Sequence, residues 1–245
     1  LTIIKKILKD KNMSKDRYNP REIKNKISSA KNEMMSIDSF AKVEFDHKVV
    51  EVYKEYQQKL KNGNSVDFDD LLILPIKLFR NYPRVLEEYQ DRYKYILIDE
   101  YQDTNEAQYT FSKLLSAKYR NIFVVGDNDQ AIYAFRGANY KNILNFEKDY
   151  PEAKTILLEE NYRSTKTILN AANSVIKNNH ERKDKNLWSN NATGNKIKYK
   201  EVANEKEEAS FVGTEIKRLL SEGINEEDIA VLYRTNAQSR VIEEE

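Results

Sequence analysis

Short apolar runs alternate with segments of helical pattern in the middle of the chain. The runs cover residues 95–98, 122–125 and 155–158, and polar residues follow each of them directly. Helical periodicity fills residues 104–118 and 139–149 between the runs. Short buried strands that alternate with helices are typical of a parallel α/β sheet, whose sites lie at the carboxyl ends of the strands. We therefore expect the polar residues that follow the three runs at one edge of a sheet.

The chain on either side of these runs has a mainly helical pattern. Asn19 and Pro20 supply a cap and a first-turn proline for a helix that reaches about residue 30. Asp38 can cap a longer helix, and Gly63 ends it. Further helices are expected to start at Asp67 and Pro83 and to cover 165–178 and 204–221, with strands near 197–202 and 229–233.

These elements divide the chain into three parts. Residues 1–66 form a helical part, and residues 67–158 carry the three apolar runs with their helices. Residues 159–245 have the pattern of a second α/β unit. The predicted fold class is therefore α/β, with a helical part at the N-terminus.

The composition excludes several classes of protein. The chain has no cysteine, so a disulfide scaffold and a thiolate metal site are excluded, and its two histidines do not favour a zinc site. No apolar run approaches the ~18 residues of a membrane span. We expect a cytoplasmic protein with no membrane partner. The first residue is Leu1 rather than Met, and glycine is scarce, so we also expect a fragment of a longer protein.

The net charge of +1 conceals a segregation of charge along the chain. Residues 1–60 and 161–200 are rich in Lys and Arg, whereas residues 64–110 and 201–245 are rich in Asp and Glu. Basic stretches separated by an acidic one fit a protein that binds a polyanion and has a metal-binding centre. Solvated helices of a lysine-rich protein are the alternative explanation.

The first strand tip has the residues of a Walker B site. Asp99 and Glu100 follow an apolar strand, where an aspartate can hold a magnesium ion that bridges nucleotide phosphates. The adjacent carboxylate can orient or deprotonate the attacking water. An acidic turn after a buried strand, without any catalytic role, is the alternative.

The second tip adds polar groups that can contact phosphates and aromatic groups that can stack on bases. Gln130 can hydrogen-bond a γ-phosphate, and Arg136 can neutralise charge on a transferred phosphoryl group, an effect of ~10³–10⁵ in rate for a well-placed arginine. Tyr133 and Phe135 offer ring faces to unpaired bases, at ~1–3 kcal/mol per stacked base. Spacing alone favours core packing for these two rings.

The third tip continues into Tyr162 and Arg163. The tyrosine ring can stack on adenine, and the guanidinium can reach a phosphate. A helix start with an exposed tyrosine is the alternative. A basic loop follows, in which Lys177, Arg182, Lys183 and Lys185 either contact DNA phosphates or are simply solvated.

Together these segments resemble the superfamily-one DNA helicases of the UvrD, PcrA and Rep type. The stretch DEYQDTN at 99–105 is similar to motif II of the family, VVGDNDQAIYAFRGA at 124–138 to motif III, and LEENYRS at 158–164 to motif IV. DFDDLL at 67–72 and YRTNAQSR at 233–240 resemble two further family segments. The resemblance implies parts of two RecA-like P-loop NTPase domains, with residues 1–66 as a helical 1B-like insertion, residues 67–158 as the rear of domain 1A and residues 159–245 as the front of domain 2A.

The resemblance also implies roles for the catalytic residues. Asp99 and Glu100 would hold Mg²⁺, and Glu100 would be the general base for water. Gln130 would sense the γ-phosphate of ATP, while Arg136 and Arg163 would contact it from the first and second motor domains.

The remaining implied roles concern adenine and DNA. Tyr162 would stack on the adenine of ATP, and Tyr133 with Phe135 would stack on bases of single-stranded DNA. Arg234 and Asn236 would contact the same DNA strand from the second domain. Phe135 departs from the family pattern, in which tryptophan is common at this position.

The implied activity is an ATP-dependent 3′–5′ DNA helicase that couples hydrolysis to movement on single-stranded DNA and to unwinding in repair or replication. The implied partners are single-stranded DNA, single/double-strand junctions, and repair, replication-initiator or RNA polymerase proteins. None of the six glycines is followed by lysine, so the chain has no P-loop and we expect it to be inactive alone. The alternatives are an ATP-dead module that binds single-stranded DNA or a protein, and the helicase half of a helicase–nuclease.

Overall fold

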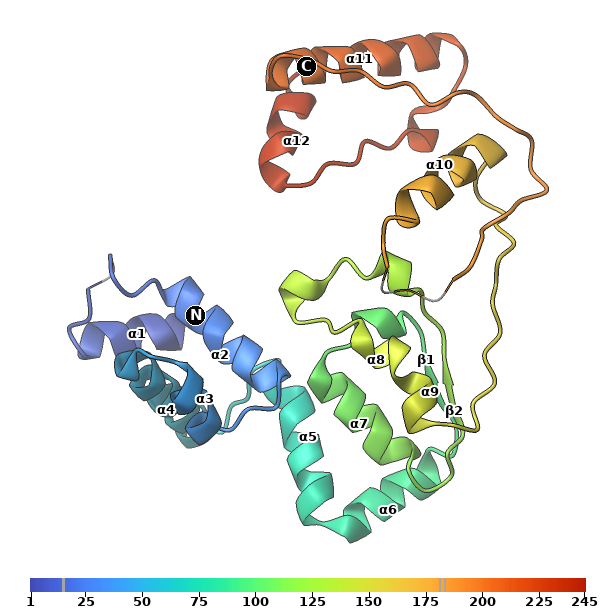
Figure 1. Ribbon diagram of the computed structural model, residues 1–245. Helices are drawn as coiled ribbons and strands as arrows, with labels where there is room; N and C mark the ends of the chain where they lie inside the picture. Colours follow the sequence, from blue (N-terminus) through green and yellow to red (C-terminus); the bar gives the residue numbers. More distant parts are fainter. Residues whose placement is uncertain (15, 181, 183) are drawn as a thin grey trace. The chain divides into compact units, whose positions relative to one another are not determined.

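The computed structural model describes residues 1–14, 16–180, 182 and 184–245, and divides them into two compact units (Figure 1). The first unit comprises Leu1–Glu159 together with Asn173–Leu187. The second comprises Glu160–Ala172 and Trp188–Glu245, so the boundary falls within helix α10 (Lys166–Ile176).

The first unit begins with a small helical bundle (Figure 1). It consists of α1 (Thr2–Asp10), α2 (Pro20–Asn32), α3 (Ile37–Val43) and α4 (His47–Asn62). Apolar side chains from these helices form a contiguous core, in which Ile4, Ile7 and Val52 are fully buried. The bundle therefore has an apolar centre of its own.

Two of the predicted helix starts in the bundle have different outcomes. The cap at Asn19 is confirmed, since its Oδ1 accepts a hydrogen bond of 2.9 Å from the backbone of Arg21. The single long helix predicted from Asp38 is wrong. Two helices lie there instead, because Ser36 caps α3 and Asp46 caps a separate α4.

Three further helices follow the bundle, and a buried ion pair joins the start of the first of them to α2. These helices are α5 (Asp70–Asn81), α6 (Pro83–Arg92) and α7 (Glu106–Ser116). The ammonium of Lys31 on α2 lies 2.6 Å from Asp67 and 2.8 Å from Asp70, and its side chain is only 3% exposed. Helix α5 starts at Asp70 rather than at the predicted Asp67, whose Oδ1 accepts a hydrogen bond from the Asp70 N–H. The pair thus fixes the start of α5 against α2.

The sheet of the first unit has two parallel strands, β1 (Ile96–Ile98) and β2 (Ile122–Val124). Ile96 pairs with Ile122 and Ile98 with Val124. These side chains are partly buried, whereas Leu97, on the other face, is exposed. Short elements follow the strands: η1 (Tyr101–Asp103), η2 (Asn128–Gln130), η3 (Ala134–Arg136), α8 (Lys141–Leu144) and α9 (Phe146–Asp149).

The other predicted strands are not present. Residues 155–158, 197–202 and 229–233 have no ladder partner in the part of the chain that the structure describes, where β1 and β2 form the only ladder. A strand is stabilised by hydrogen bonds to a neighbour, so an apolar run without one does not form a ladder. The fold is therefore mostly helical with a small parallel sheet, and the α/β class is supported only at this coarse level.

The second unit contains the first turns of α10, then α11 (Glu205–Ser221), η4 (Glu226–Asp228) and α12 (Asn236–Glu243), with α12 beside α11 (Figure 1). The predicted helices at 165–178 and 204–221 are confirmed, and Asn204 caps the second of them. Helix α12 is not among the helices that the sequence predicted. Its signal is the capping box of Thr235 and Gln238. None of the helices in the described residues is long and apolar enough to cross a membrane.

Candidate functional site

The end of β1 places two carboxylates at the edge of the sheet. Asp99 and Glu100 are both exposed, and Oδ1 of Asp99 accepts a hydrogen bond of 2.9 Å from the Glu100 N–H. Glu100 has φ 49° and ψ 43°, a left-handed conformation that few residues with a side chain adopt. A cavity of about 420 Å³ lies beside them, with Ile98 and Phe111 among its lining residues. The sharp turn at Glu100 thus presents both carboxylates at the cavity.

Gln102 joins this tip to the tip of β2. Its Nε2 donates to Oε2 of Glu100 at 2.8 Å, and its Oε1 accepts from the N–H of Asp127 at 2.9 Å. The Gln102 side chain is buried, so the amide is fixed between the two tips. A Cβ at Gly126 would lie 2.5 Å from Gln102 Oε1 and 3.1 Å from the backbone nitrogen of Tyr101. Glycine is therefore required at position 126 for the tips to approach each other.

The second tip turns through η2 and fixes Gln130 at its end. Oδ1 of Asp127 accepts from the N–H of Asp129 at 2.9 Å, and Oδ2 accepts from Nε2 of Gln130 at 3.0 Å. Burial favours a higher pKa for Asp127, but hydrogen bonds from Lys185, Gln130 and the backbone outweigh it and lower the pKa. Asp127 is thus held as a carboxylate, and Gln130 is oriented by it.

An exposed aromatic cluster follows Gln130. Tyr133 is 36% exposed and Phe135 72% exposed, with their ring centroids 6.1 Å apart. The guanidinium carbon of Arg136 lies 4.9 Å from the centroid of Tyr133 and 5.4 Å from that of Phe135. Core packing, which spacing alone favoured for the two rings, is therefore wrong. The cluster presents two rings and a cation to solvent.

The other predicted site residues belong to the second unit. Tyr162 is exposed, and its hydroxyl donates to Oε2 of Glu160 at 2.9 Å. Arg163 is also exposed, and Oδ1 of the preceding Asn161 accepts from its N–H. The predicted ATP residues are therefore divided, with Gln130 and Arg136 in the first unit and Tyr162 and Arg163 in the second.

The predicted DNA residues of the second unit flank the start of α12. Arg234 and Asn236 are exposed, and Asn236 is the first residue of α12. Gln238 fixes this turn, since its Oε1 accepts from the backbone N–H groups of Arg234 and Thr235 at 3.1 and 3.0 Å. The side chains of Arg234 and Asn236 thus stand on an ordered helix start.

Two family models match the chain in succession. The UvrD/REP helicase N-terminal domain matches residues 1–151, and the UvrD-like helicase C-terminal domain matches residues 156–245. The chain belongs to the UvrD/Rep helicase family. This confirms the family that motifs II, III and IV indicated.

Named relatives of the UvrD/Rep chain support the same assignment. The chain is 53% identical over 246 residues to the ATP-dependent DNA helicase PcrA of Staphylococcus aureus strain Mu50. This match covers 99% of the chain and 34% of the relative. The chain is 55% identical over 248 residues to the ATP-dependent DNA helicase PcrA of Bacillus subtilis strain 168, with 100% and 34% covered. The chain thus spans about a third of the length of these relatives.

The carboxylates of the UvrD/Rep chain fit a magnesium ion that also has phosphate ligands. Magnesium is usually held by one or two carboxylates together with waters and substrate phosphates, rather than by a cage of protein ligands. Asp99 and Glu100 supply such a pair, both exposed at one turn. In the described residues no group of three or more His, Cys, Asp and Glu side chains forms a metal site. The donor set therefore suits a metal that arrives with a nucleotide.

Sequence reasoning missed several residues that organise this site. Gln102 lies within the DEYQDTN stretch but received no role, although its position two residues after Glu100 is the available signal. Asp127 and Asp129 lie within the VVGDNDQAIYAFRGA stretch, without a role of their own. Arg182 and Lys185 were assigned to DNA or solvent, whereas they lie on these two aspartates. Nothing in the sequence pairs residues more than fifty positions apart.

Proposed function

We propose that this chain is part of an ATP-dependent DNA helicase that moves 3′–5′ along single-stranded DNA and unwinds duplexes at junctions. The observation that carries this function is the bridge made by Gln102. One buried side chain holds Glu100, a candidate base, and the turn that ends in Gln130, a candidate phosphate sensor. Such a link suits a site in which nucleotide chemistry and a conformational response have to be coupled.

In this proposal the tip of β1 binds the metal and activates water. Asp99 and Glu100 would hold Mg²⁺, which would supply positive charge to the phosphates. Glu100 accepts the proton of the attacking water, and Gln102 orients the carboxylate for this step. Glu100, in its left-handed turn, is among the residues that line the cavity.

Three residues are proposed to contact the γ-phosphate of ATP, and a fourth to stack on its adenine. Gln130 donates to the γ-phosphate from the turn after β2, and Arg136 contacts it from the same unit. Arg163 contacts it from the second unit, while Tyr162 stacks on adenine. The exposure of Tyr162 and Arg163 supports these roles, because neither side chain is taken up in the core of its unit.

Single-stranded DNA binds to the aromatic cluster and to the start of α12. Tyr133 and Phe135 stack on unpaired bases, and their exposure leaves the ring faces accessible. Arg234 and Asn236 contact the strand from the second unit. From the family resemblance we also propose that the whole protein is cytoplasmic and binds repair, replication-initiator or RNA polymerase proteins.

The proposed domain layout follows the motifs. Residues 1–66 form the 1B-like subdomain, residues 67–158 the rear of a RecA-like domain 1A, and residues 159–245 the front of a RecA-like domain 2A. The independent apolar core of the bundle supports the first of these parts. An ATP-dead binding module is not favoured, since the identity to proteins named as ATP-dependent helicases extends over the whole chain.

The test uses the full-length protein with ATP, Mg²⁺, a single-stranded oligonucleotide and three duplexes: one blunt, one with a 3′ single-stranded tail and one with a 5′ tail. We expect ATP hydrolysis that single-stranded DNA stimulates at least tenfold, and unwinding of the 3′-tailed duplex only. Binding of single-stranded DNA without any hydrolysis would instead establish the ATP-dead module. Unwinding from the 5′ tail would overturn the proposed polarity.

A further inference from the structure

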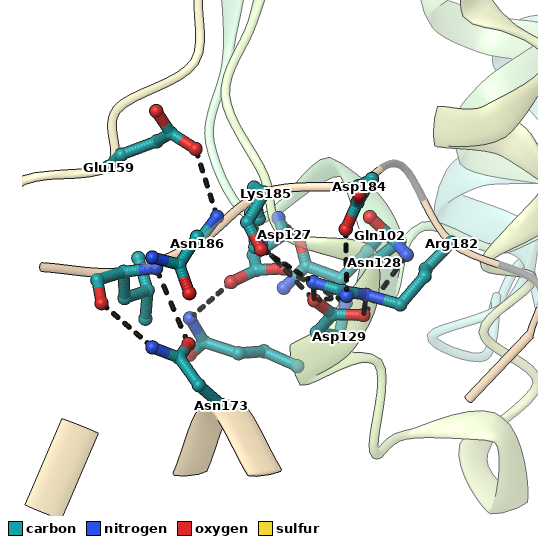
Figure 2. Close-up of polar contacts among 12 residues, drawn as sticks. Gln102, Asp127, Asn128, Asp129, Glu159, Asn173, Arg182, Asp184, Lys185 and Asn186 are labelled. Carbon is teal, nitrogen blue, oxygen red and sulfur yellow. Dashed lines mark hydrogen bonds and ion pairs between the residues drawn. The ribbon is translucent and has the colours of Figure 1, made fainter. Parts of the chain in front are cut away.

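Two basic residues of the segment after α10, Arg182 and Lys185, form ion pairs with two acidic residues after β2, Asp127 and Asp129 (Figure 2). Lys185 forms an ion pair with Asp127, and its Nζ also lies 3.6 Å from Oδ2 of Asp129. Arg182 donates to Asp129 from Nε at 3.2 Å and from Nη2 at 3.0 Å. The same Nη2 donates to the backbone oxygen of Lys185 at 3.1 Å, which links the two cations. All four residues belong to the first unit. We call these residues the clasp.

The side chains of the clasp are withdrawn from solvent. Arg182 and Asp129 are 9% and 8% exposed, and Lys185 and Asp127 are 14% and 21% exposed. Cations that are partly buried and paired with carboxylates in this way are neither freely solvated nor free for a DNA phosphate, so both expectations for Arg182 and Lys185 are wrong. Lys183, from the same prediction, lies outside the described residues.

The segment that carries the clasp is tied to the rest of the first unit. The Asn186 N–H donates to Oε1 of Glu159 at 2.9 Å. Asn173, in the last turns of α10, donates to the Leu187 carbonyl at 2.8 Å and accepts from the Leu187 N–H at 3.3 Å. Figure 2 shows these contacts beside the clasp. The two cations are therefore presented by an anchored loop.

The clasp acts on the same turn that orients Gln130. Lys185 and Gln130 donate to the carboxylate of Asp127, and Gln102 accepts from its N–H. Two carboxylates on one short turn repel each other, and the cations of the clasp compensate this repulsion. Removal of a cation would leave a partly buried negative charge and loosen the turn.

We infer that Arg182 and Lys185 are positioning residues that hold the turn from Asp127 to Gln130 in the geometry from which Gln130 acts on the nucleotide. This inference rests on the proposed function. The two cations lie outside the three motifs. In this inference they affect the nucleotide only through the position of Gln130.

The kinetic test compares Lys185→Met and Arg182→Met with the wild type in the full-length protein. Methionine keeps the length of the side chain and removes the charge. We expect the kcat of DNA-stimulated ATP hydrolysis to fall by ten- to a hundredfold, with the KM for ATP and the affinity for single-stranded DNA within twofold of wild type. Lys185→Arg should recover most of the loss. The matched control is Lys206→Met, which changes an exposed lysine of the second unit and should have no effect.

Other outcomes would overturn the inference. A loss of DNA affinity with an altered salt dependence would mean that the cations bind phosphates. Equal losses of ATP binding, DNA binding and thermal stability in both variants, without recovery in Lys185→Arg, would mean a general structural role.

A second measurement does not depend on catalysis. Hydrogen exchange of the backbone amides of Asp127, Asp129 and Gln130 in the full-length protein should be at least tenfold faster in Lys185→Met, and unchanged in Lys206→Met. Unchanged exchange in Lys185→Met would contradict the clasp. If the wild type hydrolysed no ATP but the exchange increased as expected, the proposed function would fail while the clasp on this turn would stand.

Discussion

The amide nitrogen of Gln102 donates a hydrogen bond of 2.8 Å to Oε2 of Glu100, from a side chain that is itself buried. A buried donor of this kind has few alternative partners, so it restricts the orientation of the exposed carboxylate. Through its Oε1, the same side chain also holds the N–H of Asp127. One residue therefore fixes the relation between the two strand tips.

Replacement of Gln102 by Glu should uncouple the tips while nearly preserving the shape of the side chain. The substitution puts a carboxylate against Glu100 in place of a donor, and like charges repel. We expect kcat for ATP hydrolysis in the full-length protein to fall by about 10²-fold or more, in the range of a misplaced general base. The measurement is steady-state hydrolysis, with the exposed Gln58→Glu as the control. Hydrolysis within twofold of wild type would show that the bridge has no catalytic consequence.

The exposed rings predict a stacking surface for single-stranded DNA. Phe135→Ala should weaken binding by about 1–3 kcal/mol, the usual loss for one stacked base, and Phe135→Trp should preserve or strengthen binding. Both are measured by titration of an oligonucleotide at one fixed salt concentration. Phe45→Ala removes another exposed ring and should leave the affinity unchanged. Equal losses in Phe135→Ala and Phe45→Ala would mean that neither ring is a specific platform.

The ion pair between α2 and α5 should be a major contribution to the stability of the first unit. Lys31→Met leaves Asp67 and Asp70 without their buried cation, and such losses are about 3–5 kcal/mol. Lys26→Met breaks a pair with Glu44 in which the lysine side chain is 48% exposed, and should change stability by only about 0–1 kcal/mol. Native-state hydrogen exchange of the α2 amides measures both. Similar exchange rates in the two variants would contradict the difference in burial.

Acid should weaken the contact between α7 and α9. Burial favours a higher pKa for Asp149, but hydrogen bonds from Lys113 and Tyr109 outweigh it and lower the pKa below its ordinary 3.8. A depressed carboxyl pKa stabilises the fold above the unfolded value, and the contribution is lost as the pH falls through the folded value. The thermal midpoint of Asp149→Asn should therefore lie below that of wild type by a constant amount above about pH 5, and this difference should shrink below about pH 4. A difference that grows on acidification would have the wrong sign.

The sequence predicted most helices because their signals are local. The helix caps depend on neighbours within a few positions, as at Asn19 with Pro20 and at Asn204. The same holds for the polar tips that follow residues 98 and 125. The strands near 155–158 and 229–233 were predicted from apolar content alone, and a ladder needs a partner that periodicity cannot supply.

The site shows the same division between local and distant information. The carboxylates and the aromatic cluster could be found from short motifs, since each motif lies in one turn. The pairing of Arg182 with Asp129 could not, because it joins segments that are 53 positions apart through burial and charge. The exposure of Tyr133 and Phe135 also depends on packing, and for this reason spacing alone favoured the wrong environment.

The most direct measurement is ATP hydrolysis and ATP binding by the full-length Glu100→Gln variant, with the exposed Glu88→Gln as the control. Glutamine keeps the size of the side chain but cannot accept a proton from water. We predict that single-stranded DNA no longer stimulates hydrolysis, with kcat reduced by at least about 10²-fold, while the affinity for ATP stays within twofold of wild type. Near-normal hydrolysis by Glu100→Gln would contradict the assignment of the two strand tips as the site of ATP chemistry.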